Sequence, residues 1–258
     1  MLAQHRGQPG LPAPDMYPKL GLTRNVIRPN YALITPDGLV ASVLPGWSGT
    51  TAHVILSSAM GAGFSQLLLN LEPGGNGDVH TGADEWFIYL ITGAGSLDGQ
   101  SLPPGSYAWI PPDQSFTFQA TDPGTSLLVF RKQYEPLDGH PPGPRLTGHP
   151  DKIASIPFLG DSHARLQTLL PDNLTADMAV NIFTYDPGAT LPFVETHVME
   201  HGMLFLEGRG VYRLGDDWHP VTAGDAIWIA PYCPQWFIAA GPGPARYIYY
   251  KDINRSPA

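Results

Sequence analysis

Short runs in which apolar and polar residues alternate make up most of the chain, beginning near NYALITPDGLV at residues 30–40. Alternation with a period of two is typical of strands that bury one face. Glycine and proline separate most of these runs, as they do in the turns between strands. No long stretch shows the spacing of an amphipathic helix. We therefore predict an all-β protein with one short helical or 3₁₀ turn, around residues 162–169.

The pattern of strands and turns occurs twice along the chain. Residues 67–95 match residues 180–210, so that Gly93 and Gly95 fall on Gly208 and Gly210. Further on, PPGSYAWIPPDQSF matches TAGDAIWIAPYCPQW. Each copy has the order of strands and glycine turns expected of a double-stranded jelly roll. The repeat predicts two such β-barrels, related by duplication.

The domain limits follow changes in composition along the chain. Residues 1–20 are rich in proline and glycine, which predicts a flexible N-terminal arm. An N-terminal barrel is expected over residues 21–132 and a C-terminal barrel over residues 158–258. The proline-rich stretch QYEPLDGHPPGPRLTGHPDK predicts a linker over residues 133–157.

Composition limits the partners and the compartment. A net charge of −9 argues against nucleic acid and anionic membranes as partners. The single cysteine, Cys233, permits no internal disulfide and favours a reducing, cytoplasmic environment. No apolar segment is long enough to cross a bilayer, and the first residues lack the apolar core of a secretory signal. We expect a small-molecule ligand and a symmetric homo-oligomer.

The most informative cluster is the run ETHVMEH, which contains Glu195, His197 and His201 and is followed by Gln235. Residues 195 and 197 point to the same face of a strand because they are two positions apart. One carboxylate, two imidazoles and an amide oxygen can together hold a divalent metal. Such an oxygen-rich set suits manganese or magnesium better than copper, and zinc also accepts these ligands.

The repeat provides an internal control for this cluster. The matching positions of the first copy hold His80, Gly82, Trp86 and, approximately, Phe116. Only one of these four side chains can bind a metal. The donor set therefore serves chemistry rather than folding, and the N-terminal barrel carries a degenerate site. Another pair does recur in both copies: Glu200 corresponds to Glu85, which predicts a shared structural role in the turn and not a metal ligand.

The second copy resembles the cupin family in the spacing of its glycines, its ligands and its proline. Its ligand order of Glu, His, His and Gln departs from the usual two His, Glu and His. This order resembles the bicupin branch, sometimes called glyoxylate-induced proteins, that hydrolyses (S)-ureidoglycine. The resemblance covers roughly residues 21–256 and is also carried by NYALITPDGLV, PYCPQ and YIYYKDINR.

This resemblance implies an activity, a cofactor and residue roles. Ureidoglycine would be hydrolysed to ureidoglycolate and ammonia in purine and allantoin catabolism. Manganese would be held by Glu195, His197, His201 and Gln235, and Tyr247 and Lys251 would contact the substrate. From its own chemistry, and apart from the resemblance, Glu195 is also expected to bind substrate and to carry a proton if its pKa is raised toward neutrality. Glu195 and Lys251 are therefore the expected catalytic residues.

Two other functions compete with this one. The first is a manganese cupin enzyme that acts on another small carboxylate such as oxalate, for which a third histidine in place of Gln235 would be expected. The second is a non-enzymatic binding bicupin, which leaves the difference between the two copies unexplained. Neither the exact ureido substrate nor the metal follows from the residues alone.

Overall fold

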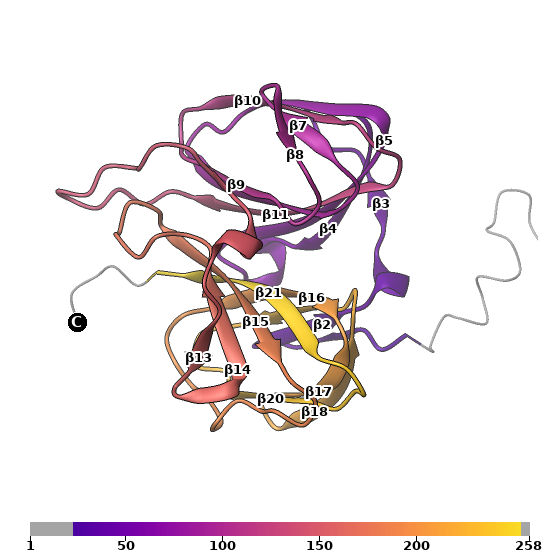
Figure 1. Ribbon diagram of the computed structural model, residues 1–258, viewed down its shortest axis with the longest axis vertical. Helices are drawn as coiled ribbons and strands as arrows, with labels where there is room; N and C mark the ends of the chain where they lie inside the picture. The colour runs from indigo at the N-terminus through magenta and orange to yellow at the C-terminus, as the bar shows by residue number, and fades with distance from the viewer. Residues whose placement is uncertain (1–22, 254–258) are drawn as a thin grey trace, which may run out of the picture.

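Two β-barrels packed against each other make up the computed structural model, which describes residues 23–253 (Figure 1). The predicted all-β fold is confirmed. Helical structure within this range is limited to 3₁₀ turns at Pro36–Gly38, Ser58–Met60 and Pro150–Lys152. The arm predicted for residues 1–20 lies outside the described residues.

The N-terminal barrel is built on one large sheet. Its strands are β3 (Ala41–Ser42), β4 (Trp47–Leu56), β5 (Ser65–His80), β6 (Asp84–Thr92), β7 (Gly95–Leu97), β8 (Gln100–Leu102), β9 (Tyr107–Ile110), β10 (Ser115–Ala120), β11 (Thr125–Gln133) and β12 (Leu146–Gly148). Alternate residues of each strand point inward and fill the barrel, as Leu67, Leu69 and Leu71 of β5 do. This interior is therefore an apolar core.

The C-terminal barrel consists of two sheets. Its strands are β1 (Val26–Ile27), β2 (Tyr31–Ile34), β13 (Ile156–Phe158), β14 (Asp161–Thr168), β15 (Met178–Tyr185), β16 (His201–Glu207), β17 (Arg209–Leu214), β18 (Asp217–Thr222), β19 (Ala226–Ile229), β20 (Gln235–Ala239) and β21 (Ala245–Asp252). The larger sheet has the order β1-β2-β19-β16-β21-β15-β14-β13, and β18-β17-β20 form the smaller one.

The barrels exchange strands, which the expectation of two consecutive barrels did not include. Strand β2 lies near the start of the chain but pairs with β19 of the C-terminal barrel, with Tyr31 opposite Ile229 (Figure 1). Strand β12, from the expected linker, pairs with β9 of the N-terminal barrel. All four residues of β2 are buried, and such an apolar run is stable only inside a sheet. The ranges 21–132, 133–157 and 158–258 remain predictions.

The predicted turn around residues 162–169 is wrong, because Asp161–Thr168 form strand β14. This strand pairs with β15 along five residues, from Ala164 opposite Tyr185 to Thr168 opposite Asn181. The backbone hydrogen bonds to β15 and the burial of Ala164 outweigh the weak local preference for a turn.

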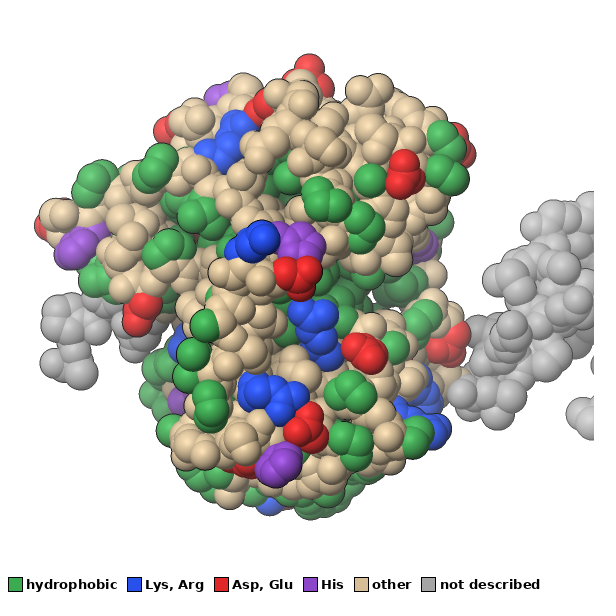
Figure 2. Space-filling model, in the orientation of Figure 1, with side chains coloured by type: hydrophobic (Ala, Val, Ile, Leu, Met, Phe, Trp, Pro, Cys, Tyr) green, Lys and Arg blue, Asp and Glu red, His purple; other side chains and the backbone are tan. Residues whose placement is uncertain are grey.

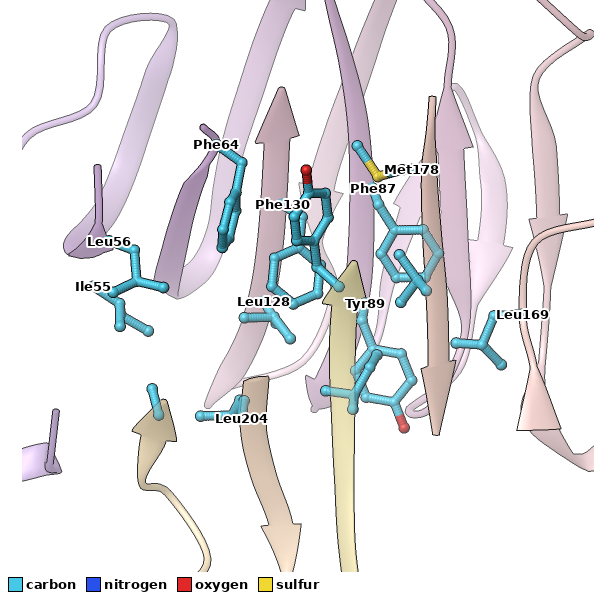
Figure 3. Close-up of a cluster of buried hydrophobic side chains, with 14 of the residues drawn as sticks. Ile55, Leu56, Phe64, Phe87, Tyr89, Leu128, Phe130, Leu169, Met178 and Leu204 are labelled. Carbon is cyan, nitrogen blue, oxygen red and sulfur yellow. The ribbon is translucent and has the colours of Figure 1, made fainter. Parts of the chain in front are cut away.

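A shared hydrophobic cluster joins the two barrels (Figure 3). The N-terminal barrel contributes Phe87, Leu128 and Phe130, and the C-terminal barrel contributes Met178 and Leu204. All five side chains are at most 5% exposed. The outer faces of β6, β11, β15 and β16 are thus buried against the other barrel, which fixes the position of one barrel on the other.

Glu200 connects the C-terminal barrel to its neighbour through hydrogen bonds. Its Oε2 accepts from Trp228 Nε1 at 3.1 Å, and its Oε1 accepts from the backbone N–H of Gly63 at 2.9 Å. Trp228 belongs to the same barrel as Glu200, whereas Gly63 belongs to the other. Glu200 is therefore committed to the interface between the barrels, although it directly precedes His201 in the chain.

Glu85 forms the same pair of contacts in the opposite direction. Its Oε2 accepts from Trp109 Nε1 in its own barrel at 2.8 Å and from the N–H of Asp177 in the other barrel at 3.1 Å. These matching bonds confirm a shared structural role for Glu85 and Glu200, but the role lies at the interface between the barrels and not in the turn as predicted. Burial raises the pKa of Glu85 from 4.5 to about 7, although its two hydrogen bonds act in the opposite direction.

Glu85→Gln is expected to remove a pH dependence of stability. A carboxyl group whose pKa is raised by folding stabilises the protein fully below its ordinary pKa of 4.5, and that contribution is lost as the pH rises through about 7. The stability of the wild type should therefore fall relative to the variant over this window, by on the order of 1 kcal/mol per pH unit. Thermal denaturation at several pH values measures the difference.

The exposed glutamate Glu72 offers the control for this prediction. Glu72→Gln removes a carboxyl group from the surface and should leave the fall in stability between about pH 4.5 and 7 in place. If the difference between the wild type and Glu85→Gln were independent of pH, the carboxyl group of Glu85 would have an ordinary pKa, and the expectation would be wrong.

Candidate functional site

A cavity of about 150 Å³ lies inside the C-terminal barrel. Strands β13, β15, β16, β17, β20 and β21 and the segment before β16 surround it. The polar lining residues are Glu195, His197, His201, Tyr212, Gln235, Tyr247, Tyr249 and Lys251, and the apolar ones are Phe158, Phe183, Met199 and Met203. All six residues expected at the site from the sequence therefore line one cavity.

Two histidines face each other in this cavity. The Nε2 atoms of His197 and His201 are 3.1 Å apart. The Nδ1 atom of His197 lies 3.1 Å from the carbonyl oxygen of Met199, and Nδ1 of His201 lies 3.2 Å from that of Tyr250. Because a carbonyl oxygen only accepts hydrogen bonds, each Nδ1 carries the proton. Each neutral ring therefore directs the lone pair of Nε2 towards the other.

Burial keeps these rings uncharged. It lowers the pKa of His201 from 6.5 to about 3, and the neighbouring His197 lowers it further. Burial also lowers the pKa of His197, which is half-buried. Two neutral Nε2 atoms at 3.1 Å repel each other unless a cation lies between or beside them. The histidine pair is thus suited to binding a positive ion.

Gln235 places a third possible metal ligand beside the two histidines. Its Nε2 is 3.1 Å from Nε2 of His197, and its Oε1 accepts from the hydroxyl of Tyr212 at 2.8 Å. If the amide turned over, the oxygen would face His197 and Nε2 would donate to the Tyr212 hydroxyl instead, because a hydroxyl both donates and accepts. The side chain can therefore offer an oxygen to a cation without losing its hydrogen bond to Tyr212.

Backbone hydrogen bonds hold Glu195 next to Gln235. It exchanges two main-chain hydrogen bonds with Gln235, at 2.8 and 2.9 Å, which anchor the segment before β16 to β20. Burial raises the pKa of the Glu195 carboxyl group, and the charge of Lys251 lowers it. Within residues 23–253, no group of three His, Cys, Asp or Glu side chains has the arrangement of a metal site. The side chains of His197, His201 and Gln235 contact one another, and the carboxylate of Glu195 lines the same cavity.

Strand β21 supplies the other expected residues. Tyr247, Tyr249 and Lys251 alternate along it and all line the cavity. The hydroxyl of Tyr247 is 3.2 Å from that of Tyr185, and burial raises the pKa of Tyr247 well above 10.0. Tyr247 is therefore a neutral hydroxyl group. Lys251 brings a positive charge close enough to affect the pKa of Glu195 and of both histidines.

Several lining residues were not predicted from the sequence. Tyr212, which holds Gln235, lies at an alternate inward position of RGVYRL together with Gly210 and Leu214. That alternation was a usable signal for its orientation. Its distance from Gln235 depends on the pairing of β17 with β20, which no local pattern reveals.

The N-terminal barrel has a hydrophobic core at the corresponding place. Trp86 packs edge to face against Phe116, with ring centroids 5.8 Å apart, and Arg131 lies over the Trp86 ring. His80 is exposed, and its Nδ1 accepts from the N–H of Gly82 at 3.0 Å. The two barrels thus share a fold but have different interiors, as the repeat predicted.

The surface adds two observations about partners. On the face shown in Figure 2, Lys and Arg side chains alternate with Asp and Glu and form no continuous basic band. Among the helices of the described range, none has the length and apolar character needed to span a membrane.

Comparisons with known proteins give close relatives over nearly the whole chain. Residues 181–250 match the family described as "Cupin domain". The (S)-ureidoglycine aminohydrolase of Arabidopsis thaliana is 36% identical, over 92% of this chain and 80% of the relative. The (S)-ureidoglycine aminohydrolase of Escherichia coli is 35% identical, over 88% of this chain and 89% of the relative.

Solved structures agree with the fold. The crystal structure of the E. coli protein Ylba superposes with a TM-score of 0.81 at 31% identity, covering 93% of this chain and 98% of that one. An oxalate decarboxylase structure from Bacillus subtilis superposes with a TM-score of 0.66 at 13% identity, covering 87% of this chain and 78% of that one. At that identity the second likeness concerns the fold alone, which is a pair of cupin barrels.

Proposed function

The chain belongs to the (S)-ureidoglycine aminohydrolase family of cupin proteins, and from this membership we propose that it hydrolyses (S)-ureidoglycine to (S)-ureidoglycolate and ammonia. The reaction breaks the bond from the α-carbon to the amine and forms a bond from that carbon to a water oxygen. It would be a step of purine and allantoin breakdown. The proposal includes the cytoplasmic location and the homo-oligomeric state expected from the sequence.

The observation that carries the proposal is the facing pair of imidazole lone pairs in the second barrel alone. A divalent metal, manganese by the family resemblance, would be held by His197, His201, the oxygen of Gln235 and the carboxylate of Glu195. The donor set fits such an ion, because two neutral nitrogens, a carboxylate and an amide oxygen meet at one cavity. A bound divalent ion supplies positive charge that orients the amine and the water and lowers the pKa of that water.

The other cavity residues have roles that follow from their charge and position. Lys251 binds the carboxylate of the substrate, because it is the cation that lines the cavity. The neutral hydroxyl of Tyr247 donates a hydrogen bond to the same ligand. Glu195 accepts a proton from the attacking water and returns it to the leaving amine, since a carboxylate in a half-buried position can do both. The ureido nitrogen donates electron density to the α-carbon as ammonia leaves.

The oxalate alternative is not favoured. The oxalate decarboxylase structure shares only the fold with this chain, at 13% identity. In addition, the fourth candidate metal ligand of this chain is Gln235 rather than a histidine. A purely binding protein would not need two imidazoles with opposed lone pairs in one of two otherwise related barrels. We retain the aminohydrolase as the proposed function.

The direct test is an ammonia-release assay on freshly generated ureidoglycine. We expect the purified protein to release ammonia when loaded with manganese, to lose most of this activity after treatment with a chelator, and to recover it when manganese is restored. Oxalate, tested in parallel for carbon dioxide and peroxide, should give neither. Ammonia release no faster than the unaided decay of ureidoglycine, with or without metal, would show that the proposal is wrong.

A further inference from the structure

A second, larger cavity adjoins the histidine cavity. It has a volume of about 370 Å³ and shares Phe158, Met199, Tyr249 and Lys251 with the first. Its remaining lining residues are Leu166, Thr168, Leu170, Pro171, Asp172, Ala179, Asn181, Asp252 and Ile253. Lys251 therefore stands where the two cavities meet, with the histidines on one side of it and a mostly apolar chamber on the other.

Asn181 is the side-chain amide in the wall of this chamber. It lies on β15 between Thr168 of β14 and Tyr249 of β21, its partners across the sheet. Its side chain is on the same strand face as Phe183, which lines the histidine cavity. Only 4% of Asn181 is exposed. A side-chain amide offers N–H donors and an oxygen acceptor, so a ligand in this largely apolar chamber can form hydrogen bonds with it.

The other polar residues of the chamber are less suited to hold a ligand. Thr168 and Asp172 are exposed, so water competes for their hydrogen bonds. Asp252 already accepts a hydrogen bond from the N–H of Glu200 at 2.6 Å. Asn181 donates a hydrogen bond to Tyr249, which partly offsets the rise in the pKa of Tyr249 caused by burial. Besides the N–H given to Tyr249, a side-chain amide has an oxygen acceptor and a second N–H donor.

We propose that Asn181 is a specificity-determining residue that recognises the ureido group of the substrate, an inference that rests on the proposed function. A ureido group presents a carbonyl oxygen and N–H groups in one plane. A carboxamide presents the complementary pair, an N–H and an oxygen, also in one plane. The two therefore match through one hydrogen bond in each direction. A carboxylate cannot form this pair because it has no donor for the ureido oxygen.

The position of Lys251 allows the substrate to bind with its ureido group near Asn181 and its amine near the histidines. A substrate whose carboxylate is bound at the junction of the cavities has its α-carbon there as well. The amine then points towards the histidines and the ureido group extends towards Asn181. The residue thus distinguishes ureidoglycine from other α-amino acids without touching the bond that breaks.

The test compares two competitive inhibitors, ureidoglycolate and glycolate, which differ in the ureido group. The wild type should bind ureidoglycolate more tightly. In Asn181→Ala, and in Asn181→Leu, which keeps the approximate size but loses both the N–H donors and the oxygen acceptor, this preference should fall about ten- to hundredfold. The affinity for glycolate and the manganese content should stay as in the wild type. An unchanged preference in metal-loaded variants would overturn the proposal.

Two further variants separate recognition from a structural effect. In a Tyr249→Phe background, Asn181→Ala should still reduce the preference, because the amide acts on the ligand itself; no further reduction would show that Asn181 only positions Tyr249. Thr184→Val, on the opposite face of β15, should leave the preference unchanged. A wild type that releases no ammonia refutes the proposed function, whereas an active wild type whose Asn181 variants keep the preference refutes only the role of Asn181.

Discussion

His201→Ala is expected to abolish metal binding and to lower ammonia release by at least about a thousandfold. His201 is 5% exposed, and its Nε2 faces Nε2 of His197 at 3.1 Å. Alanine removes one of the two imidazoles and has no side-chain atom that can bind a metal. Elemental analysis of the purified protein gives the metal content, and the rate of ammonia release gives the activity.

The first barrel provides the matched control. His80 is the single potential ligand among the positions of the first copy that match the site, and it is exposed. His80→Ala should therefore keep both the metal content and the activity of the wild type. Full metal content in His201→Ala would contradict the assignment of the site to the second barrel, and so would metal loss in His80→Ala.

The second large effect is expected from Glu195→Gln. The amide keeps the size of the side chain and can still offer an oxygen to the metal, but it cannot accept and return a proton. We therefore expect kcat to fall by a factor of about 10² to 10⁴, while the metal content changes little. Steady-state ammonia release, measured on protein of known manganese content, tests this expectation.

Lys251→Met separates proton transfer from substrate binding. Methionine approximates the apolar part of the lysine side chain and removes its charge, so the carboxylate of the substrate loses its partner. This variant should act mainly through KM, whereas Glu195→Gln should act mainly through kcat. If Glu195→Gln kept the kcat of the wild type with metal bound, Glu195 would be at most a ligand.

Much of the site was predictable from residue types and spacing. Glu195, His197, His201 and Gln235 stand out because the corresponding positions of the first copy hold only one possible metal ligand, His80. Their convergence depends on the pairing of distant segments, as the backbone bridge between Glu195 and Gln235 shows. Tyr212 and Asn181 could not be singled out, because one aromatic residue and one amide in a strand have no distinctive local pattern.

Local residue patterns were enough to predict the all-β class, the duplication and the candidate metal donors, because alternation along a strand decides which side chains share a face. The tertiary structure alone decided that β2 completes the opposite barrel, that Glu85 and Glu200 hold the barrels together, and that His201 stays neutral. These features depend on strand register and on exclusion of water, both of which involve residues far apart in the chain. They therefore cannot be predicted from a local pattern.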